Sequence, residues 1–201
     1  MSMNQRIQQH MRNFRFLLIT FATGTFYFCF YLVGITFGVA MAFTLVGLPI
    51  IHYVLRSTHT FMQYERIHTR VYTGISIDPI PSRTRSDGNL WEQVKTELLD
   101  ARNWRAIFSL MQKFLIGLVS ITSAALLYVT PLLFLLVPFF YRLSYISILG
   151  MEIRTLGASL LTMLAGVVLT WIGSYLGNRL VMRIGGYTRR MVEELAGKGT
   201  Y

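Results

Sequence analysis

The sequence predicts an all-α protein embedded in a membrane, a four-helix bundle made of two helical hairpins. Apolar side chains make up 53% of its 201 residues and charged side chains only 14%, whereas about a quarter of a soluble domain is charged. The apolar residues form runs, and the charges lie beside those runs. The length suits one domain, so we expect residues 1–201 to form a single membrane domain.

The first apolar run must fold into two spans. Residues 16–55 include no Asp, Glu, Lys or Arg. As one helix they would measure about 60 Å, against a hydrocarbon core of about 30 Å. We therefore predict spans at about 16–35 and 37–55. The turn between them is expected near Gly34–Gly38, where glycine gives the backbone the freedom that a reversal needs.

Small residues recur at four-residue intervals in two places, a spacing that lets helices approach closely in lipid. Gly173 and Gly177 form one such face, and we predict that they pack helices together, within the bundle or between copies. Gly34, Gly38 and Ala42 form the other. If Gly34 and Gly38 form the turn, they cannot form a helix-packing face, so the two interpretations exclude each other.

Two later apolar runs predict the second hairpin. The third run, residues 114–141, would be about 42 Å long as a helix. Pro131 and Pro138 should bend or end it, and the span is placed at 114–138. The fourth span is predicted at 156–177, after a short loop.

The distribution of charge places both ends of the chain in the cytoplasm. Of the 19 Lys and Arg residues, 17 lie before the first span, between the second and third, or after the fourth. Basic residues accumulate on the cytoplasmic side of membrane proteins. This pattern explains the net charge of +10 without a nucleic-acid partner. We expect a multi-pass protein of the cell membrane, with residues 56–113 as a cytoplasmic segment.

The cytoplasmic segment contains two predicted interface anchors, Trp91 and Trp104. Each tryptophan begins an amphipathic stretch, and tryptophan prefers the headgroup level of a bilayer. We predict that both stretches are helices resting on the membrane; a docking surface for a partner is the alternative. Before them, the second span should continue as helix to Gly74, which can adopt the left-handed C-cap conformation. The apolar positions that follow the tryptophans are Val94 and Leu98, and then Ile107, Phe108, Met111 and Phe114.

No set of residues in the sequence suggests catalysis or a cofactor. An active site needs converging acids, bases, nucleophiles or metal ligands, and within the spans only His52 titrates in the ordinary pH range. Since it lies four residues from Arg56, we interpret it as an interfacial hydrogen-bonding residue rather than a ligand or proton relay. The single cysteine, Cys29, can form no internal disulfide. We expect a non-enzymatic protein with no cofactor or metal.

The segment after the fourth span carries a basic cluster that we predict to contact lipid headgroups or a partner. The pair Gly185–Gly186 lies within it and should loosen the helix, since glycine costs about 1 kcal/mol relative to alanine. We hypothesise that the tail beyond this pair alternates between the membrane and a partner; a fixed basic flank is the alternative. The basic residues are Arg179, Arg183, Arg189 and Arg190.

Three segments resemble a known family. They are Phe28–Ile51, which contains the element Thr-Leu-Val-Gly-Leu-Pro at 44–49, then Tyr64-Glu65-Arg66, and Asp100-Ala-Arg-Asn-Trp-Arg105 before the third span. Across residues 14–180 the chain resembles the bacterial putative sensor domain, whose members commonly form the membrane part of two-component histidine kinases.

The resemblance implies a non-enzymatic sensory or accessory module of a bacterial envelope signalling system. Only about two dozen residues follow the fourth span, so a histidine kinase, regulator or transporter subunit is expected in trans, beside the lipid bilayer and a second copy as further partners. The alternative function is a membrane subunit of a transporter or permease. The lack of acidic residues within the spans argues against it, because ion and proton pathways usually need them.

Overall fold

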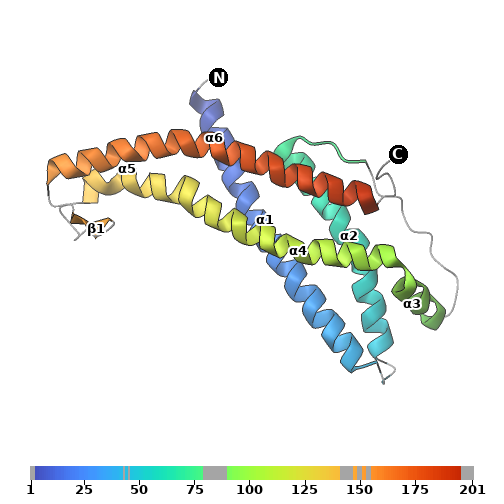
Figure 1. The fold of residues 1–201 in the computed structure, drawn as a ribbon. Coiled ribbons are helices and arrows are strands. Elements are labelled where there is room, and N and C mark those ends of the chain that lie inside the picture. Colours follow the sequence, from blue (N-terminus) through green and yellow to red (C-terminus); the bar gives the residue numbers. More distant parts are fainter. Residues whose placement is uncertain are drawn as a thin grey trace. The chain divides into compact units, whose positions relative to one another are not determined.

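The computed structural model describes residues 3–42, 44, 46–78, 90–140, 147–148, 151–152 and 155–195. Its long elements are all helical (Figure 1), which confirms the prediction of an all-α protein. They are α1 (Met3–Ala40), α2 (Gly47–Thr73), α3 (Leu90–Leu99), α4 (Ala101–Ala124), the π-helical turn η1 (Ala125–Val129), α5 (Thr130–Phe140) and α6 (Leu156–Leu195). Strands β1 (Ser147–Ile148) and β2 (Met151–Glu152) form one short antiparallel pair.

Three stretches of helix are long and apolar enough to cross a bilayer, so the chain is a membrane protein. They are Ile7–Ala40, Ala101–Phe140 and Leu156–Glu193. Helix α2 is not among them, because Arg56 and later charges interrupt its apolar character. The predicted bounds of the second span, 37–55, are wrong at their start, because residues 37–40 belong to α1 and α2 begins at Gly47. That α2 crosses the membrane stays a prediction.

The predicted turn at residues 34–38 is wrong. Helix α1 continues to Ala40, and the chain reverses between Ala40 and Gly47, where α2 begins (Figure 1). A Cβ atom at Gly34 would lie 2.7 Å from the Val54 side chain, and one at Gly38 would lie 2.7 Å from the Ile51 side chain. The two glycines thus remove side-chain bulk where α1 and α2 lie together. Of the two interpretations, the packing face is correct.

The predicted end of α2 at Gly74 is confirmed. Gly74 has φ 73°, in the left-handed region, and its N–H donates to the carbonyl oxygen of Arg70 at 3.0 Å. A segment without regular secondary structure follows, and its Ile77 lies in a hydrophobic core.

The chain divides into two compact units. Unit 1 comprises Met1–Leu18 with Val119–Val181, and unit 2 comprises Ile19–Leu118 with Met182–Tyr201. The hydrophobic core of unit 2 draws on α1, α2, α4 and the end of α6. Its buried members are Tyr27, Tyr31, Val54, Leu55, Met62, Ile77, Ile107, Leu110, Met191 and Val192.

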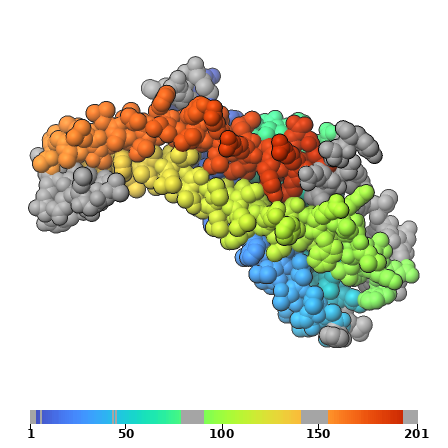
Figure 2. All heavy atoms as spheres, in the orientation of Figure 1, coloured from blue at the N-terminus to red at the C-terminus, as the bar shows by residue number. Residues whose placement is uncertain are grey.

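The apolar stripe predicted at the start of α4 is divided between two faces. Ile107 is buried in the core of unit 2, whereas Trp104 and Phe108 are exposed. In α3, Val94 is buried and Trp91 is exposed. Figure 2 shows that α3 and the start of α4, coloured green to yellow-green, are exposed on the side of the molecule drawn there.

Candidate functional site: a buried polar junction

Glu65 on α2 and Lys113 on α4 form an ion pair inside unit 2. The Lys113 ammonium donates to Glu65 Oε2, and the two side chains are 2% and 0% exposed. Removing such charges from water costs several kcal/mol for each ion, and close pairing offsets that cost. The pair therefore links α2 to α4 in this arrangement of the two helices.

Both charged residues lie on helix faces that are otherwise buried. On α2, Glu65 stands three residues after Met62 and four before Thr69, both buried. On α4, Lys113 stands three residues after the buried Leu110. The sequence alone did not reveal the pair, because Glu65 and Lys113 both fall in the segment 56–113 that was expected to be cytoplasmic. The helical spacing to buried apolar neighbours is the signal that could have found them.

Helix α1 reaches the same junction through close backbone contact with α4. A Cβ atom at Gly24 would lie 2.6 Å from the carbonyl oxygen of Lys113, and one at Gly117 would lie 3.0 Å from the Cα of Phe21. Glycine at both positions lets the two backbones meet, as small residues do between membrane helices. Three helices, α1, α2 and α4, therefore converge around the pair.

Further polar side chains surround the junction. The Tyr31 hydroxyl, from α1, donates to Thr58 Oγ1 on α2 at 3.1 Å. Glu65 Oε1, Thr69 Oγ1 and the Tyr27 hydroxyl are buried without a hydrogen-bond partner among the residues that the structure describes. Such groups are normally satisfied by ordered water. The junction is thus a polar core within an apolar protein.

His68 lies one turn beyond Glu65, between two tyrosines of the same helix. Its ring is nearly parallel to that of Tyr64, with centroids 6.2 Å apart, and lies 4.9 Å from that of Tyr72. Burial lowers the pKa of His68 to about 4, because the charged form loses its hydration. The imidazole is therefore neutral at neutral pH.

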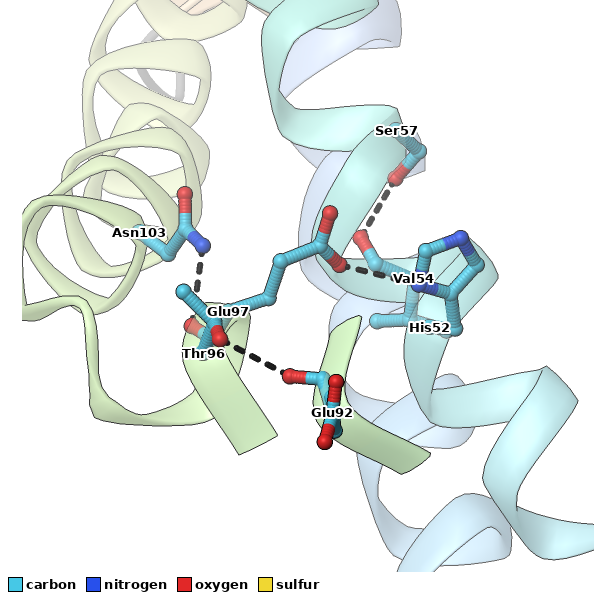
Figure 3. Close-up of polar contacts among 7 residues, drawn as sticks. All are labelled: His52, Val54, Ser57, Glu92, Thr96, Glu97 and Asn103. Carbon is cyan, nitrogen blue, oxygen red and sulfur yellow. Dashed lines mark hydrogen bonds and ion pairs between the residues drawn. The ribbon is translucent and has the colours of Figure 1, made fainter. Parts of the chain in front are cut away.

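A second polar contact ties α3 to α2 and α4 (Figure 3). Nδ1 of His52 lies 3.1 Å from Glu97 Oε2, an ion pair when the imidazole is protonated. Asn103 Nδ2, on α4, donates to the Glu97 carbonyl oxygen at 2.9 Å. His52 thus has an ion-pair partner on α3 that spacing alone did not reveal. Its predicted hydrogen bond stays a prediction, because His52 Nδ1 and Glu97 Oε2 have no hydrogen-bond partner among the described residues.

The predicted anchors Trp91 and Trp104 are 58% and 41% exposed. The Trp104 indole donates to the carbonyl oxygen of Leu98 at 2.8 Å, which fixes its ring beside the end of α3. Both rings are open to a membrane or a partner, and their anchoring role stays a prediction.

Gly173 and Gly177 lie against the π-helical turn of unit 1. A Cβ atom at Gly173 would overlap the Leu127 carbonyl oxygen, and one at Gly177 would overlap the Tyr128 hydroxyl. Pro131 has no N–H to offer that carbonyl oxygen four residues before it. A Gly173 Cα–H faces it instead, a contact of the weak kind seen between close helices. The helix continues beyond Pro131 and through Pro138, so neither proline ends it.

The predicted basic cluster lies on α6, which stays helical through Gly185–Gly186. The Arg179 guanidinium stands 4.5 Å above the Tyr175 ring, and Arg189 Nε donates to Glu193 at 2.6 Å. Arg183 and Arg190 are exposed.

Beyond the glycine pair, the tail of α6 is held by the chain itself. Thr188, Met191 and Val192 are buried in unit 2, and the Tyr187 hydroxyl donates to Gln112 Oε1 at 3.3 Å. In this structure the apolar side of the tail faces the protein core. The alternation of the tail between the membrane and a partner stays a prediction, beside the alternative of a fixed basic flank.

A family model described as Putative sensor matches residues 16–192, which include the whole junction. This confirms the family resemblance seen in the sequence. No curated protein and no solved structure matches the chain.

Proposed function

We propose that this chain, which belongs to the Putative sensor family, is a non-enzymatic sensory or accessory module of a bacterial envelope signalling system. It crosses the membrane four times, with both ends in the cytoplasm, and passes its signal to a partner in trans. Family membership supports the sensory role, and the basic flanks of the spans support the orientation.

The buried pair of Glu65 and Lys113 is the observation that carries the mechanism. A sensor needs an element with two discrete arrangements that the input can bias. A buried ion pair resists partial separation, because each charge would be left in an apolar surrounding. Lys113 is continuous through α4 with an apolar helix that runs to Phe140. A movement of that helix in the membrane would therefore be transmitted to α2 in one step.

The proposed topology is tested by labelling single cysteines from outside the cell. In a Cys29→Ser background, cysteines replace Arg56, Ser147 and Tyr201 in turn, and an impermeant maleimide is applied to intact cells. Only the cysteine at position 147 should react before the membrane is opened. Reaction at position 56 in intact cells would contradict the four-span arrangement.

The signalling role is tested by comparing cells with and without the chain under membrane-active compounds and osmotic shift. We expect deletion to abolish a transcriptional response that the wild-type chain restores and that an inserted, stably produced Glu65→Gln variant does not. A deletion that changes solute uptake and leaves every transcriptional response intact would favour the transporter subunit instead.

A further inference from the structure

Helices α3 and α4 are joined by a single residue, Asp100, which lies between them in the chain. Asp100 Oδ1 accepts a hydrogen bond from the N–H of Arg102 at 2.9 Å, and the Asp100 carbonyl oxygen accepts one from the N–H of Asn103 at 3.0 Å. An aspartate in this position caps a helix, because it satisfies N–H groups that have no partner within the helix. Helix α4 therefore begins, capped, directly at the end of α3.

Side chains of α4 in turn cap the carboxyl end of α3. The last four carbonyl groups of a helix have no partner within it. Asn103 Nδ2 donates to the Glu97 carbonyl oxygen at 2.9 Å, and Trp104 Nε1 donates to the Leu98 carbonyl oxygen at 2.8 Å. Both helix ends are thus satisfied at one joint, which fixes the angle between α3 and α4. We call Asp100, Asn103 and Trp104 the corner.

The polar groups of the corner are used inside the protein. Asn103 is 3% exposed. The Trp104 ring is 41% exposed, yet its N–H, the polar group of an otherwise apolar side chain, is bonded to Leu98. This bond gives Trp104 a role in positioning α3 that a membrane anchor does not need.

Through the corner, α4 holds α3 where it meets α2. Glu97 Oε2 lies 3.1 Å from His52 Nδ1 (Figure 3), and Val94, on the inner side of α3, is 1% exposed. His52 and Glu65 are 13 residues apart on α2, which is about 20 Å along the helix. Contacts at two points this far apart resist rotation of α2 against the partner helices.

We propose that the corner makes α3 a rigid extension of α4, so that α4 is linked to α2 through α3 as well as through the Glu65–Lys113 pair. The proposal rests on the proposed function and deepens it, since it names a second route by which a movement of α4 reaches α2. With one link, α2 could turn about the ion pair. With two links, it follows α4 in orientation as well as in position, and the three corner residues act as positioning residues.

The test measures how firmly α3 is held to α2. Cysteines replace Lys95 on α3 and Thr60 on α2, both exposed, in the full chain carrying Cys29→Ser, and they are spin-labelled in lipid nanodiscs. Pulsed electron paramagnetic resonance gives the distribution of distances between the labels, which we expect to be narrow. Trp104→Phe, which keeps an apolar ring and loses the N–H, should widen it. The same variant should speed amide hydrogen exchange in α3 about fivefold, as the loss of one hydrogen bond implies.

Two comparisons make the result specific to the corner. Trp171→Phe makes the same change at a tryptophan of α6 that is 72% exposed, and it should alter neither reading. Asp100→Asn, which can still cap α4, should keep the distribution narrow, whereas Asp100→Ala should widen it. Narrow distributions in both Trp104→Phe and Asp100→Ala would overturn the proposal, and so would equal widening by the two substitutions of Asp100.

In cells, Trp104→Phe should weaken the transcriptional response of the deletion test, while insertion and abundance stay as in the wild type. A widened distribution together with a full response would show that the link through α3 carries no signal, which overturns the proposal. A wild-type chain that restores no response would defeat the proposed function alone, because the distance distributions still decide whether the corner holds α3 to α2.

Discussion

Glu65 and Lys113 are separated by 48 positions in the sequence and form one buried ion pair. Among the residues that the structure describes, Glu65 is the only buried carboxylate and Lys113 is the only buried lysine or arginine. Around them α1 approaches α4 through Gly24 and Gly117. The charged pair thus lies beside a close backbone contact between α1 and α4.

Breaking the pair should cost more than removing it. We expect Glu65→Leu or Lys113→Met alone to lower the free energy of unfolding by about 3–5 kcal/mol, because each leaves one buried charge without its counterion. The double variant, Glu65→Leu with Lys113→Met, should cost much less than the sum. Reversible unfolding in detergent, arranged as a double-mutant cycle, gives the coupling energy. Additive losses would show that the two charges do not meet inside the protein.

Close backbone approach at Gly24 gives a second prediction. Gly24→Ala should lower the free energy of unfolding by about 1–3 kcal/mol, the usual cost of overpacking, because its Cβ would lie 2.6 Å from the Lys113 carbonyl oxygen. The matched control is Gly186→Ala, within α6, where a Cβ meets no atom within 4 Å. That change should stabilise by about 0.5–1 kcal/mol. Similar effects of the two substitutions would contradict the close approach of α1 and α4.

The sequence predicted those features that depend on local pattern. The apolar runs predicted the membrane location, and Gly74 predicted the end of α2. The turn was misplaced because Gly34 and Gly38 suit a reversal as well as a close helix contact, and only the positions of Val54 and Ile51 decide between them. The ion pair escaped for a related reason. A charged residue on an amphipathic helix is expected to face solvent, and only the position of a counterion on a distant helix shows that it is buried.

Burial of His68 predicts a dependence of stability on pH. Its pKa is about 4 in the folded chain against about 6.5 when unfolded, so the unfolded state binds more protons between these values. Stability is complete above pH 6.5 and falls as pH drops towards 4. From pH 7 to 4.5 this group should cost about 2–3 kcal/mol. His68→Phe, which keeps an aromatic ring between Tyr64 and Tyr72, should remove that part of the loss when unfolding is measured at both pH values. An unchanged slope in the variant would assign the pH dependence to other groups.

The tail of α6 should behave as part of the core rather than as a free basic flank. Met191 is 4% exposed and belongs to the same apolar cluster as Ile77, whereas Met182, nine residues earlier on the same helix, is 46% exposed. Met191→Ala should lower the free energy of unfolding by about 2–5 kcal/mol, the range for a buried large-to-small change. Met182→Ala should change it by less than about 0.5 kcal/mol. Because the loosened tail would open more often, Met191→Ala should also speed proteolysis after Arg189 and Arg190. Equal melting behaviour and equal cleavage in the two variants would mean that the tail does not rest in the core.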